Sequence, residues 1–259
     1  MKKNNYIYSL FVLFLLTLVS CSGEKSNSGK LVQRLVETTE DGQKSSSTFS
    51  YDDKKIVSID GVDTKTNYSY TDELITKKVV FDKKKQLSIT TDYLYQNGNL
   101  VSAKEANSVV KYTYAADHVV EYQKFTISAD GKEIKEFHGK LVFKNGNLVE
   151  EERVLDNSEA GVIEKYTYTF EYDDKINPMQ SIVGYDKLLD RGAAVSKNNS
   201  IIATRSMMRT QNNQSTSSAN FYSYAYKYDE EGYPIENVSE AIMPANGKSG
   251  YLKTEFFYM

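Results

Sequence analysis

Apolar and polar residues alternate with a period of two along most of this chain. Aromatic side chains stand two positions apart, directly before polar stretches rich in Asp, Asn and Gly. Successive side chains of a β-strand point to opposite faces, so the alternation predicts strands that each have one apolar face. The segments that carry this pattern are 49–51, 68–70, 93–95, 112–114, 141–143, 166–172 and 222–228.

The phrase Asn-Gly-Asn-Leu-Val occurs twice, at 97–101 and 145–149. Both central residues of a type I′ turn need a positive φ, which Asn and Gly tolerate. We therefore interpret the phrase as a hairpin turn, with Leu and Val beginning the return strand, rather than as a binding motif used twice. Asp130-Gly131 and Asn246-Gly247 predict two further turns.

Together these signals predict an all-β fold, an antiparallel up-and-down meander of hairpins that is strongly curved or closes into a barrel. The pattern breaks after Tyr172. There Asn177-Pro178 is a typical start for a helix, and we expect one short helix or crossover near 178–190. Residues 206–220 are rich in Ser, Thr, Asn and Gln, which predicts a long exposed polar loop.

The N-terminus reads as an export signal. Lys2 and Lys3 precede an apolar run that is too short for a good transmembrane span. The run ends in Leu18-Val19-Ser20-Cys21, which resembles the bacterial lipobox. That resemblance implies cleavage before Cys21 and lipid on its sulfur. We accordingly divide the chain into a signal peptide (1–20), a lipidated and flexible tether (21–30) and a single β domain (31–259).

Composition narrows the classes of function. Cys21 is the single cysteine, so the chain can form no internal disulfide and has no cysteine for a zinc site. The net charge is −3, and loss of Lys2 and Lys3 with the signal takes it to −5. This mildly acidic balance argues against a nucleic-acid partner. The expected partners are the membrane, through the lipid on Cys21, and a glycan, peptide or envelope protein.

A family resemblance emerges around the break in the pattern. Tyr172-Asp173-x-Lys175-x-Asn177-Pro178, followed by Ser196-x-Asn198-Asn199, resembles a family of Bacteroidota-type outer-membrane lipoproteins. The hairpins also resemble degenerate tyrosine-aspartate (YD) repeats of the Rhs class, although only 228–232 keeps the expected glycine. The resemblance implies a strongly curved or porin-like β-sheet, an outer-membrane location in an undetermined leaflet, and no known activity.

Charged residues decide between a membrane barrel and a tethered domain. The terminal strand LKTEFFYM is reminiscent of outer-membrane barrels, which need an uninterrupted apolar outer band. Lys135, Glu136, His138 and Lys140 interrupt one predicted strand on both faces. We therefore expect a domain outside the bilayer that is tethered to it by the lipid.

Two tyrosine-rich strands supply the candidate ligand-binding residues. Each set shares one strand face, where aromatic side chains either pack across strands or form a platform for a glycan or peptide. The candidates are Tyr166, Tyr168, Tyr172, Tyr222, Tyr224, Tyr226 and Tyr228, with Phe170 in the same stripe.

Catalytic and metal-binding motifs are missing from the sequence. It contains no G-x-S-x-G element, HExxH pair, phosphate-binding loop or twelve-residue calcium loop. We therefore expect no catalytic residue, no metal and no cofactor, and a lipid-anchored envelope protein of binding or scaffolding type. The alternatives are a surface protein that captures glycans or nutrients through the tyrosine faces, and a hydrolase whose carboxylates converge only in the fold.

Overall fold

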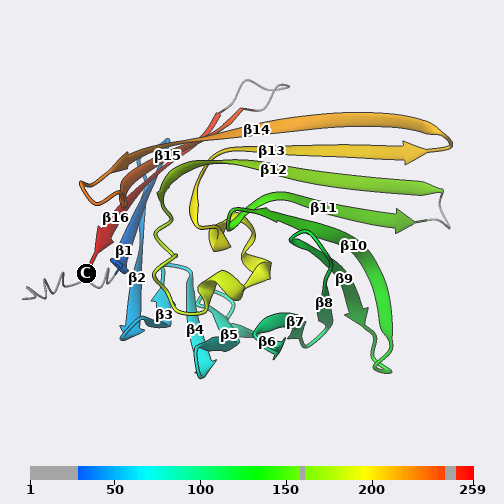
Figure 1. Ribbon diagram of the computed structural model, residues 1–259, viewed down its shortest axis with the longest axis horizontal. Coiled ribbons are helices and arrows are strands. Elements are labelled where there is room, and N and C mark those ends of the chain that lie inside the picture. The colour runs from blue at the N-terminus through cyan, green and yellow to red at the C-terminus, as the bar shows by residue number, and fades with distance from the viewer. Residues whose placement is uncertain (1–28, 158–160, 243–248) are drawn as a thin grey trace, which may run out of the picture.

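The computed structural model describes residues 29–157, 161–242 and 249–259. The chain forms a closed barrel of sixteen antiparallel strands, in which each strand pairs with its neighbours in sequence and β1 pairs with β16 (Figure 1). The predicted all-β meander that closes into a barrel is confirmed. The lipidation site at Cys21 and the turn at Asn246-Gly247 lie outside the described residues.

The strands differ in length around the barrel, and the longest cluster in its second half. Their bounds are β1 (Val32–Thr39), β2 (Lys44–Asp52), β3 (Lys55–Asp60), β4 (Thr64–Thr71), β5 (Leu74–Asp82), β6 (Leu87–Gln96), β7 (Asn99–Glu105), β8 (Ser108–Tyr114), β9 (Val119–Ile127), β10 (Glu133–Lys144), β11 (Asn147–Asn157), β12 (Val162–Ile176), β13 (Asn198–Gln211), β14 (Gln214–Tyr228), β15 (Pro234–Ile242) and β16 (Ser249–Tyr258).

Turn chemistry closes the hairpins where the sequence predicts it. Asn97 and Gly98 have φ of 51° and 77°, and Asn145 and Gly146 have φ of 54° and 81°. Positive φ at both positions is the signature of a type I′ turn, whose twist matches that of the flanking strands. The two copies of Asn-Gly-Asn-Leu-Val are therefore turns, as predicted.

The prediction of a long loop over 206–220 is wrong. This segment is a hairpin, in which β13 and β14 are joined at Asn212 and Asn213 with φ of 51° and 62°. Ser, Thr and Asn look like loop residues, but here each strand end pairs along its whole length with a neighbour. Backbone pairing across the closed sheet overrides the weak β-propensity of those polar side chains.

The connection between β12 and β13 folds into the barrel as a plug, defined here as residues 177–197 (Figure 1). Asn177 Oδ1 accepts a hydrogen bond from the Met179 amide at 2.9 Å and starts a series of turns. Two short 3₁₀ segments follow, η2 (Tyr185–Lys187) and η3 (Leu189–Val195). The expected short helix or crossover near 178–190 is confirmed, and it is 3₁₀ rather than α.

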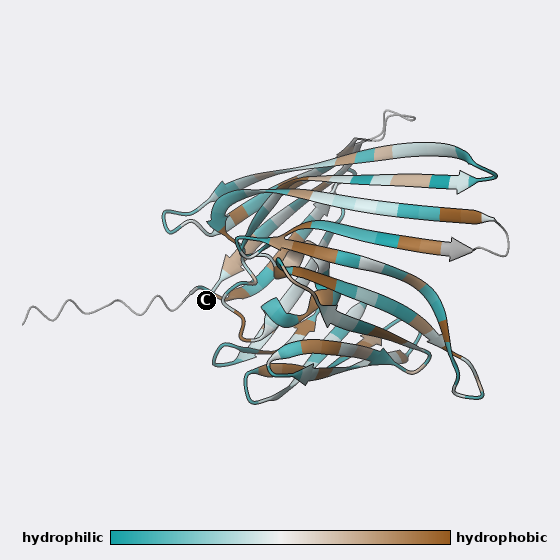
Figure 2. Ribbon diagram, turned by 45° about the vertical axis from the view of Figure 1, so that its right-hand side comes forward, coloured by the Kyte–Doolittle hydropathy of each residue, from teal (hydrophilic) through white to brown (hydrophobic). Residues whose placement is uncertain are grey.

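The plug completes the apolar core. Its Ile182, Tyr185 and Leu188 side chains are buried, and Leu188 is fully enclosed. They pack against inward-facing residues of the first strands, among them Ile56 and Ile75. Figure 2 shows apolar positions alternating with polar ones along the strands that surround the plug. A barrel of this width leaves a wide lumen that wall side chains alone do not fill, and the plug supplies the missing apolar surface.

Four tyrosines at the plugged ends of even-numbered strands have a structural role. Each hydroxyl donates a hydrogen bond to a carbonyl at the start of the preceding strand. Such bonds join Tyr51 to Val32 at 2.8 Å, Tyr95 to Ile75 at 3.0 Å, Tyr172 to Leu148 at 2.5 Å and Tyr258 to Pro234 at 2.7 Å. Each of these hydroxyls thus satisfies a strand-end carbonyl and joins two neighbouring strands at this rim.

The chain enters the barrel at the plugged rim. Gly29 lies close to Ser181 of the plug, and Lys30 forms an ion pair with Asp229 at 2.7 Å. The Met259 amide donates to the Leu31 carbonyl at 3.0 Å, so the two ends of the barrel strands meet there. The opposite rim, where β1, β3, β5 and the other odd-numbered strands end, is the open rim.

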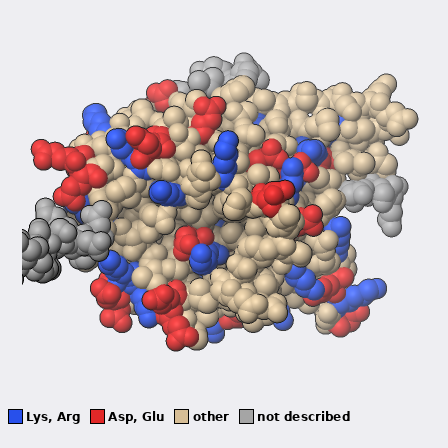
Figure 3. Space-filling model, viewed as in Figure 1, with Lys and Arg blue, Asp and Glu red and all other residues tan. Residues whose placement is uncertain are grey.

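Charged side chains of both signs cover the outer wall. Lys140 pairs with Glu150 at 3.0 Å, and Lys165 pairs with Glu152 at 2.7 Å, in the middle of neighbouring strands. Blue and red side chains are intermingled over the face seen in Figure 3. No helix in the described part of the chain is long and apolar enough to cross a membrane.

Candidate functional site

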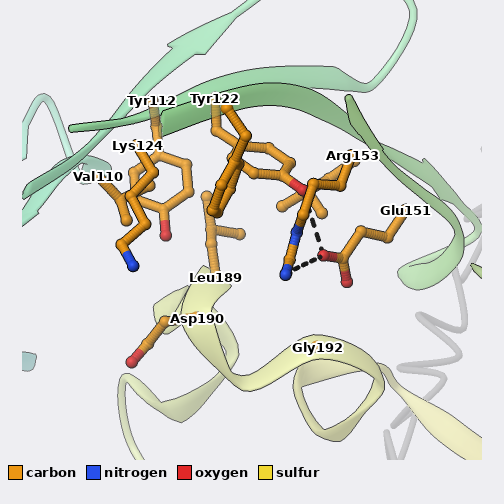
Figure 4. Close-up of a pocket in the computed structure, with 11 residues that line it drawn as sticks. Val110, Tyr112, Tyr122, Lys124, Glu151, Arg153, Leu189, Asp190 and Gly192 are labelled. Atoms are coloured by element: carbon orange, nitrogen blue, oxygen red, sulfur yellow. Dashed lines mark hydrogen bonds and ion pairs between the residues drawn. The ribbon is translucent and has the colours of Figure 1, made fainter. Parts of the chain in front are cut away.

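The candidate site is the part of the lumen between the plug and the open rim. Inward-facing side chains of β8 to β11 form its wall, and η3 forms its floor (Figure 4). They enclose a cavity of about 390 Å³. Its lining residues are Val110, Tyr112, Tyr122, Lys124, Phe137, Leu141, Glu151, Arg153, Leu189, Asp190 and Gly192.

Asp190 fixes the floor of this cavity to the wall. Its Oδ2 atom accepts a hydrogen bond from Lys78 Nζ at 2.8 Å and another from the Tyr93 hydroxyl at 2.9 Å. The Lys78 side chain is only 10% exposed, so Asp190 neutralises a buried cation. Burial, reinforced by the Asp190 charge, raises the pKa of Tyr93 above its ordinary value.

A second group of polar side chains lies on the wall. The Tyr122 hydroxyl donates to Glu151 Oε1 at 3.2 Å and to the Glu152 carbonyl at 3.0 Å. Arg153 Nη2 donates to the same Glu151 oxygen at 3.4 Å, as the dashed lines of Figure 4 show. Position 139 on β10 must be glycine, because an added Cβ would meet the Tyr122 ring and the Glu152 carbonyl.

Arg153 also takes part in an aromatic contact. Its guanidinium carbon lies 4.6 Å from the centroid of the Phe137 ring, a cation–π geometry. The Nε atom is buried and has no hydrogen-bond partner among the described residues. A buried donor without a partner is costly, and here it is the Nε atom of a side chain whose guanidinium group lines the cavity.

A second cavity, of about 230 Å³, continues from the first. It shares Phe137 and Arg153 with the first and adds Leu155, Tyr166, Tyr168 and Arg205. The Arg205 guanidinium carbon lies 5.6 Å from both the Tyr166 and Tyr168 ring centroids. Among the described residues, no carboxylate lies within ion-pair distance of Arg205.

A third cavity, of about 290 Å³, lies on the other side of the plug. Tyr224 and Tyr226 of β14 line it together with Phe170, Phe256 and plug residues such as Met179. Burial raises the pKa of Tyr224 above its ordinary value. This cavity is mainly apolar at its surface, and it carries no arginine among its lining residues.

The structure separates the two tyrosine stripes. All seven candidate tyrosines face the lumen side of β12 or β14, but β13 lies between these strands, so the stripes form no shared ladder. Tyr166 and Tyr168 line the second cavity, whereas Tyr224 and Tyr226 line the third.

The remaining candidates hold the fold together or lie outside these cavities. Tyr172 donates to Leu148 and accepts from Ser196 Oγ at 2.9 Å, and Tyr228 donates to Asp173 and stacks on Tyr226. Tyr222 lines none of the three cavities described above.

Sequence reasoning missed the charged side chains of the lumen. Arg153, Arg205, Glu151 and Asp190 were not candidates, because the aromatic stripes alone marked a face of interest. One signal was available in the alternation of Arg153 and Leu155 with other residues along one strand, whereas the position of Arg205 opposite Tyr168 is known only from the structure. Register, which the sequence does not give, was needed to place them on the lumen side.

Two aspartates near the turns at the plugged rim, Asp173 and Asp229, accept hydrogen bonds from backbone amides. Asp229 Oδ1 accepts the amides of Glu231 at 3.0 Å and Tyr233 at 2.9 Å, and Asp173 Oδ1 accepts those of Lys175 and Asn199. Within the described ranges, no three His, Cys, Asp or Glu side chains gather in a way that could hold a metal ion. These aspartates therefore cap backbone amides, as aspartate commonly does in turns.

Comparison with known proteins is informative only for the fold. No protein-family model matches the chain, and no curated protein matches it significantly. A porin-like protein from Bacteroides vulgatus matches 89% of this chain and 99% of its own length, with a TM-score of 0.56 and 14% identity. A porin-like protein from Bacteroides uniformis matches 88% of this chain and 98% of its own, with a TM-score of 0.40 and 10% identity. The first likeness establishes that this chain has the fold of a porin-like barrel.

Proposed function

We propose that this chain is a lipid-anchored protein of the outer membrane that binds a small ligand in the lumen of its plugged barrel and performs no catalysis. The observation that carries the proposal is the plug. A core of plug and wall side chains fills the lumen at one rim, whereas cavities lined by arginine and tyrosine remain toward the other.

The plug favours binding over conduction. Leu188 is fully enclosed, and Asp190 is bonded to Lys78 and Tyr93 of the wall. Moving the plug aside would expose these apolar side chains and leave the Lys78 cation without its partner, so the plug is a fixed part of the core. A lumen that is blocked at one rim and carries polar groups at defined positions is a typical ligand site.

The outer wall favours a barrel that stands outside the bilayer. A membrane barrel presents an apolar band to lipid, and charged residues near its midplane are destabilising. Here the ion pairs of Lys140 with Glu150 and of Lys165 with Glu152 lie mid-strand on the outside. The porin-like protein from Bacteroides vulgatus shares the fold, and we propose that this chain uses that fold without crossing the membrane.

The tether determines which rim of the barrel carries the lipid anchor. Cys21 lies eight residues before Gly29 and can extend at most about 29 Å from it. Gly29 and the plug are at the same rim. With lipid on Cys21, the anchor is joined to the β domain at its plugged rim, the rim opposite the cavities.

Two alternatives have a structural basis. Glu151 and Asp190 line one cavity, as a hydrolase with converging carboxylates requires, but each is already engaged by a cation, Arg153 or Lys78. Capture of a surface glycan through tyrosine faces is favoured by Tyr224 and Tyr226 in the third cavity. The first alternative predicts hydrolysis that Glu151→Gln abolishes, and the second predicts binding that Tyr224→Ala abolishes.

The experiment separates a binder from a channel. The detergent-purified protein is incorporated into planar bilayers beside a known porin, and small molecules that co-purify with it are identified by mass spectrometry. We expect no ion conductance, and a co-purifying molecule that Tyr168→Ala loses while its circular dichroism spectrum is unchanged. Discrete conductance steps, or identical co-purifying molecules in both proteins, would overturn the proposal.

Localisation is tested separately on cells. Protease accessibility of the barrel is compared in intact and permeabilised cells, with Cys21→Ala as control. We expect the native protein to fractionate with the outer membrane and the variant to be released from it. Retention of the variant in the membrane would contradict lipid anchoring, and accessibility on intact cells would assign the outer leaflet.

A further inference from the structure

The second cavity contains two arginines on opposite sides of a pair of tyrosines. Arg153 of β11 stands directly opposite Tyr166 of β12, and Arg205 of β13 stands directly opposite Tyr168. The backbones of the two arginines are therefore two strand spacings apart across the wall and two residues apart along it, a separation of about 12 Å. Both guanidinium groups line the same cavity of about 230 Å³.

The charges around this cavity are only partly paired. Glu164 accepts a hydrogen bond from the Tyr166 hydroxyl at 3.1 Å and lies 3.8 Å from Arg209. Arg153 shares Glu151 with Tyr122, and the neighbouring Lys124 pairs with Glu136 at 2.9 Å. Arg205 has no carboxylate within ion-pair distance among the described residues. The cavity thus holds one arginine that lacks an anion and another whose buried Nε lacks an acceptor.

Aromatic rings complete the site. Tyr166 and Tyr168 lie on one side of the cavity, and Phe137 lies beneath Arg153. All three are half-buried and present ring surface to the lumen. An aromatic wall takes up the flat face of a ring, whereas guanidinium forks match the planar oxygens of a carboxylate or phosphate.

We propose that this cavity binds a ring-bearing organic anion, with its carboxylate or phosphate held between the guanidinium groups of Arg205 and Arg153 and its ring against Tyr166 and Tyr168. This inference rests on the proposed function, because it names the chemistry of the ligand in the lumen. The anion supplies the charge partner that Arg205 lacks among the described residues, so binding completes the ion pairing of that arginine.

The test uses defined probes on the full protein purified in a neutral detergent. Calorimetric titrations compare benzoate with benzyl alcohol, phenyl phosphate with phenol, and glucuronate with methyl glucoside. Benzoate and phenyl phosphate distinguish a carboxylate from a phosphate preference, and glucuronate tests a sugar ring in place of an aromatic one. Each pair keeps the ring and removes the charge.

We expect at least one anion to bind more tightly than its neutral counterpart, with an affinity that falls as salt is added. Arg205→Gln should weaken that binding by about 10- to 100-fold, because a charge-assisted hydrogen bond is lost. Arg205→Lys keeps the positive charge but loses the planar guanidinium group. Its affinity for the anion should lie between those of the wild-type protein and Arg205→Gln. Arg34→Gln is the matched control, because Arg34 stacks on Phe257 on the outer wall.

Several outcomes would overturn the inference. Equal binding of charged and neutral probes, or anion binding that survives Arg205→Gln, places the ligand or its recognition elsewhere. Absence of binding by every probe also removes the anion site. None of these results contradicts the proposed binding of a ligand in the lumen. That proposal is contradicted by ion conductance, or by co-purifying molecules that are the same in the wild-type protein and in Tyr168→Ala. A circular dichroism spectrum and a melting curve for each variant exclude unfolding as the cause.

Discussion

The two halves of the barrel share the same alternation of inward and outward side chains, but the inward side chains have different roles in the two halves. Strands β2 to β9 are 6 to 10 residues long, and their inward aromatic and aliphatic side chains are buried against the plug. Strands β10 to β14 are 11 to 15 residues long and extend beyond the plug toward the open rim. There the inward residues line cavities and include Arg153 and Arg205.

The difference teaches that an inward-facing position has no fixed role in a wide barrel. Tyr68 and Tyr93 are almost fully buried because the plug covers them, whereas Tyr166 and Tyr168 on equally regular strands remain half-buried. Period-two alternation identifies the inner face, and the plug decides which part of that face becomes core.

High pH should produce the largest loss of stability, and it should act through the plugged half. Burial raises the pKa of Tyr70 and Tyr172 to about 12, and it raises that of several others still further. Unfolded tyrosine ionises near pH 10, so the unfolded state releases protons first as the pH rises. The contribution of these tyrosines to the free energy of unfolding is therefore complete below about pH 10 and is lost from there through about pH 12.

Denaturant melts across this range, with tyrosinate absorbance as a second readout, check this expectation. Most tyrosines should ionise together with unfolding rather than before it. Early ionisation of all tyrosines in a folded barrel would show that the plugged half is open to solvent.

Removal of a plug side chain should have the next largest effect. Leu188→Ala leaves a cavity in a fully enclosed site and should cost about 2–5 kcal/mol of the free energy of unfolding. Leu189→Ala, one residue along, changes a side chain that faces the lumen cavity and should cost clearly less. If urea melts show the same loss of unfolding free energy for both variants, Leu188 is not more deeply buried than Leu189.

The contact between plug and wall should contribute less than the core. Asp190→Asn removes the anion that neutralises Lys78 and should cost about 1.5–3 kcal/mol, since a hydrogen bond between charged groups is lost at a nearly buried cation. A thermal melt of the double variant Lys78→Met with Asp190→Asn tests the cause. Recovery of stability in the double variant is expected, and a further loss would contradict the pairing.

The smallest effect is expected on the outer wall. Lys77 is the neighbour of Lys78 but points outward, where it pairs with Asp92 at 3.3 Å with both side chains about half exposed. Asp92→Asn should cost about 0–1 kcal/mol, because solvent screens this pair. The two adjacent lysines thus test the inside and outside of one strand, and a loss as large as that of Asp190→Asn would refute the assignment of faces.

Sequence patterns were sufficient for most strands, the Asn-Gly turns at 97–98 and 145–146 and the crossover near Pro178, because these follow from local φ preferences and side-chain period. They failed over 206–220, where pairing with β12 and β15 makes strands from residues typical of loops. They also placed Tyr166 and Tyr168 among the candidate residues but gave no reason to choose them over Tyr172 and Tyr228, which hold strand ends together.

The sequence by itself determined that this protein is a chain of β-hairpins with a lipobox-like start and tyrosines before its turns. Those features are local, and each is written in a few neighbouring residues. Only the tertiary structure decided that β16 closes on β1, that residues 177–197 enter the lumen, and that Arg153 and Arg205 meet at one cavity. The physical reason is register: residues 52 positions apart share a site because three adjacent strands align them, and backbone pairing over the whole barrel sets that alignment.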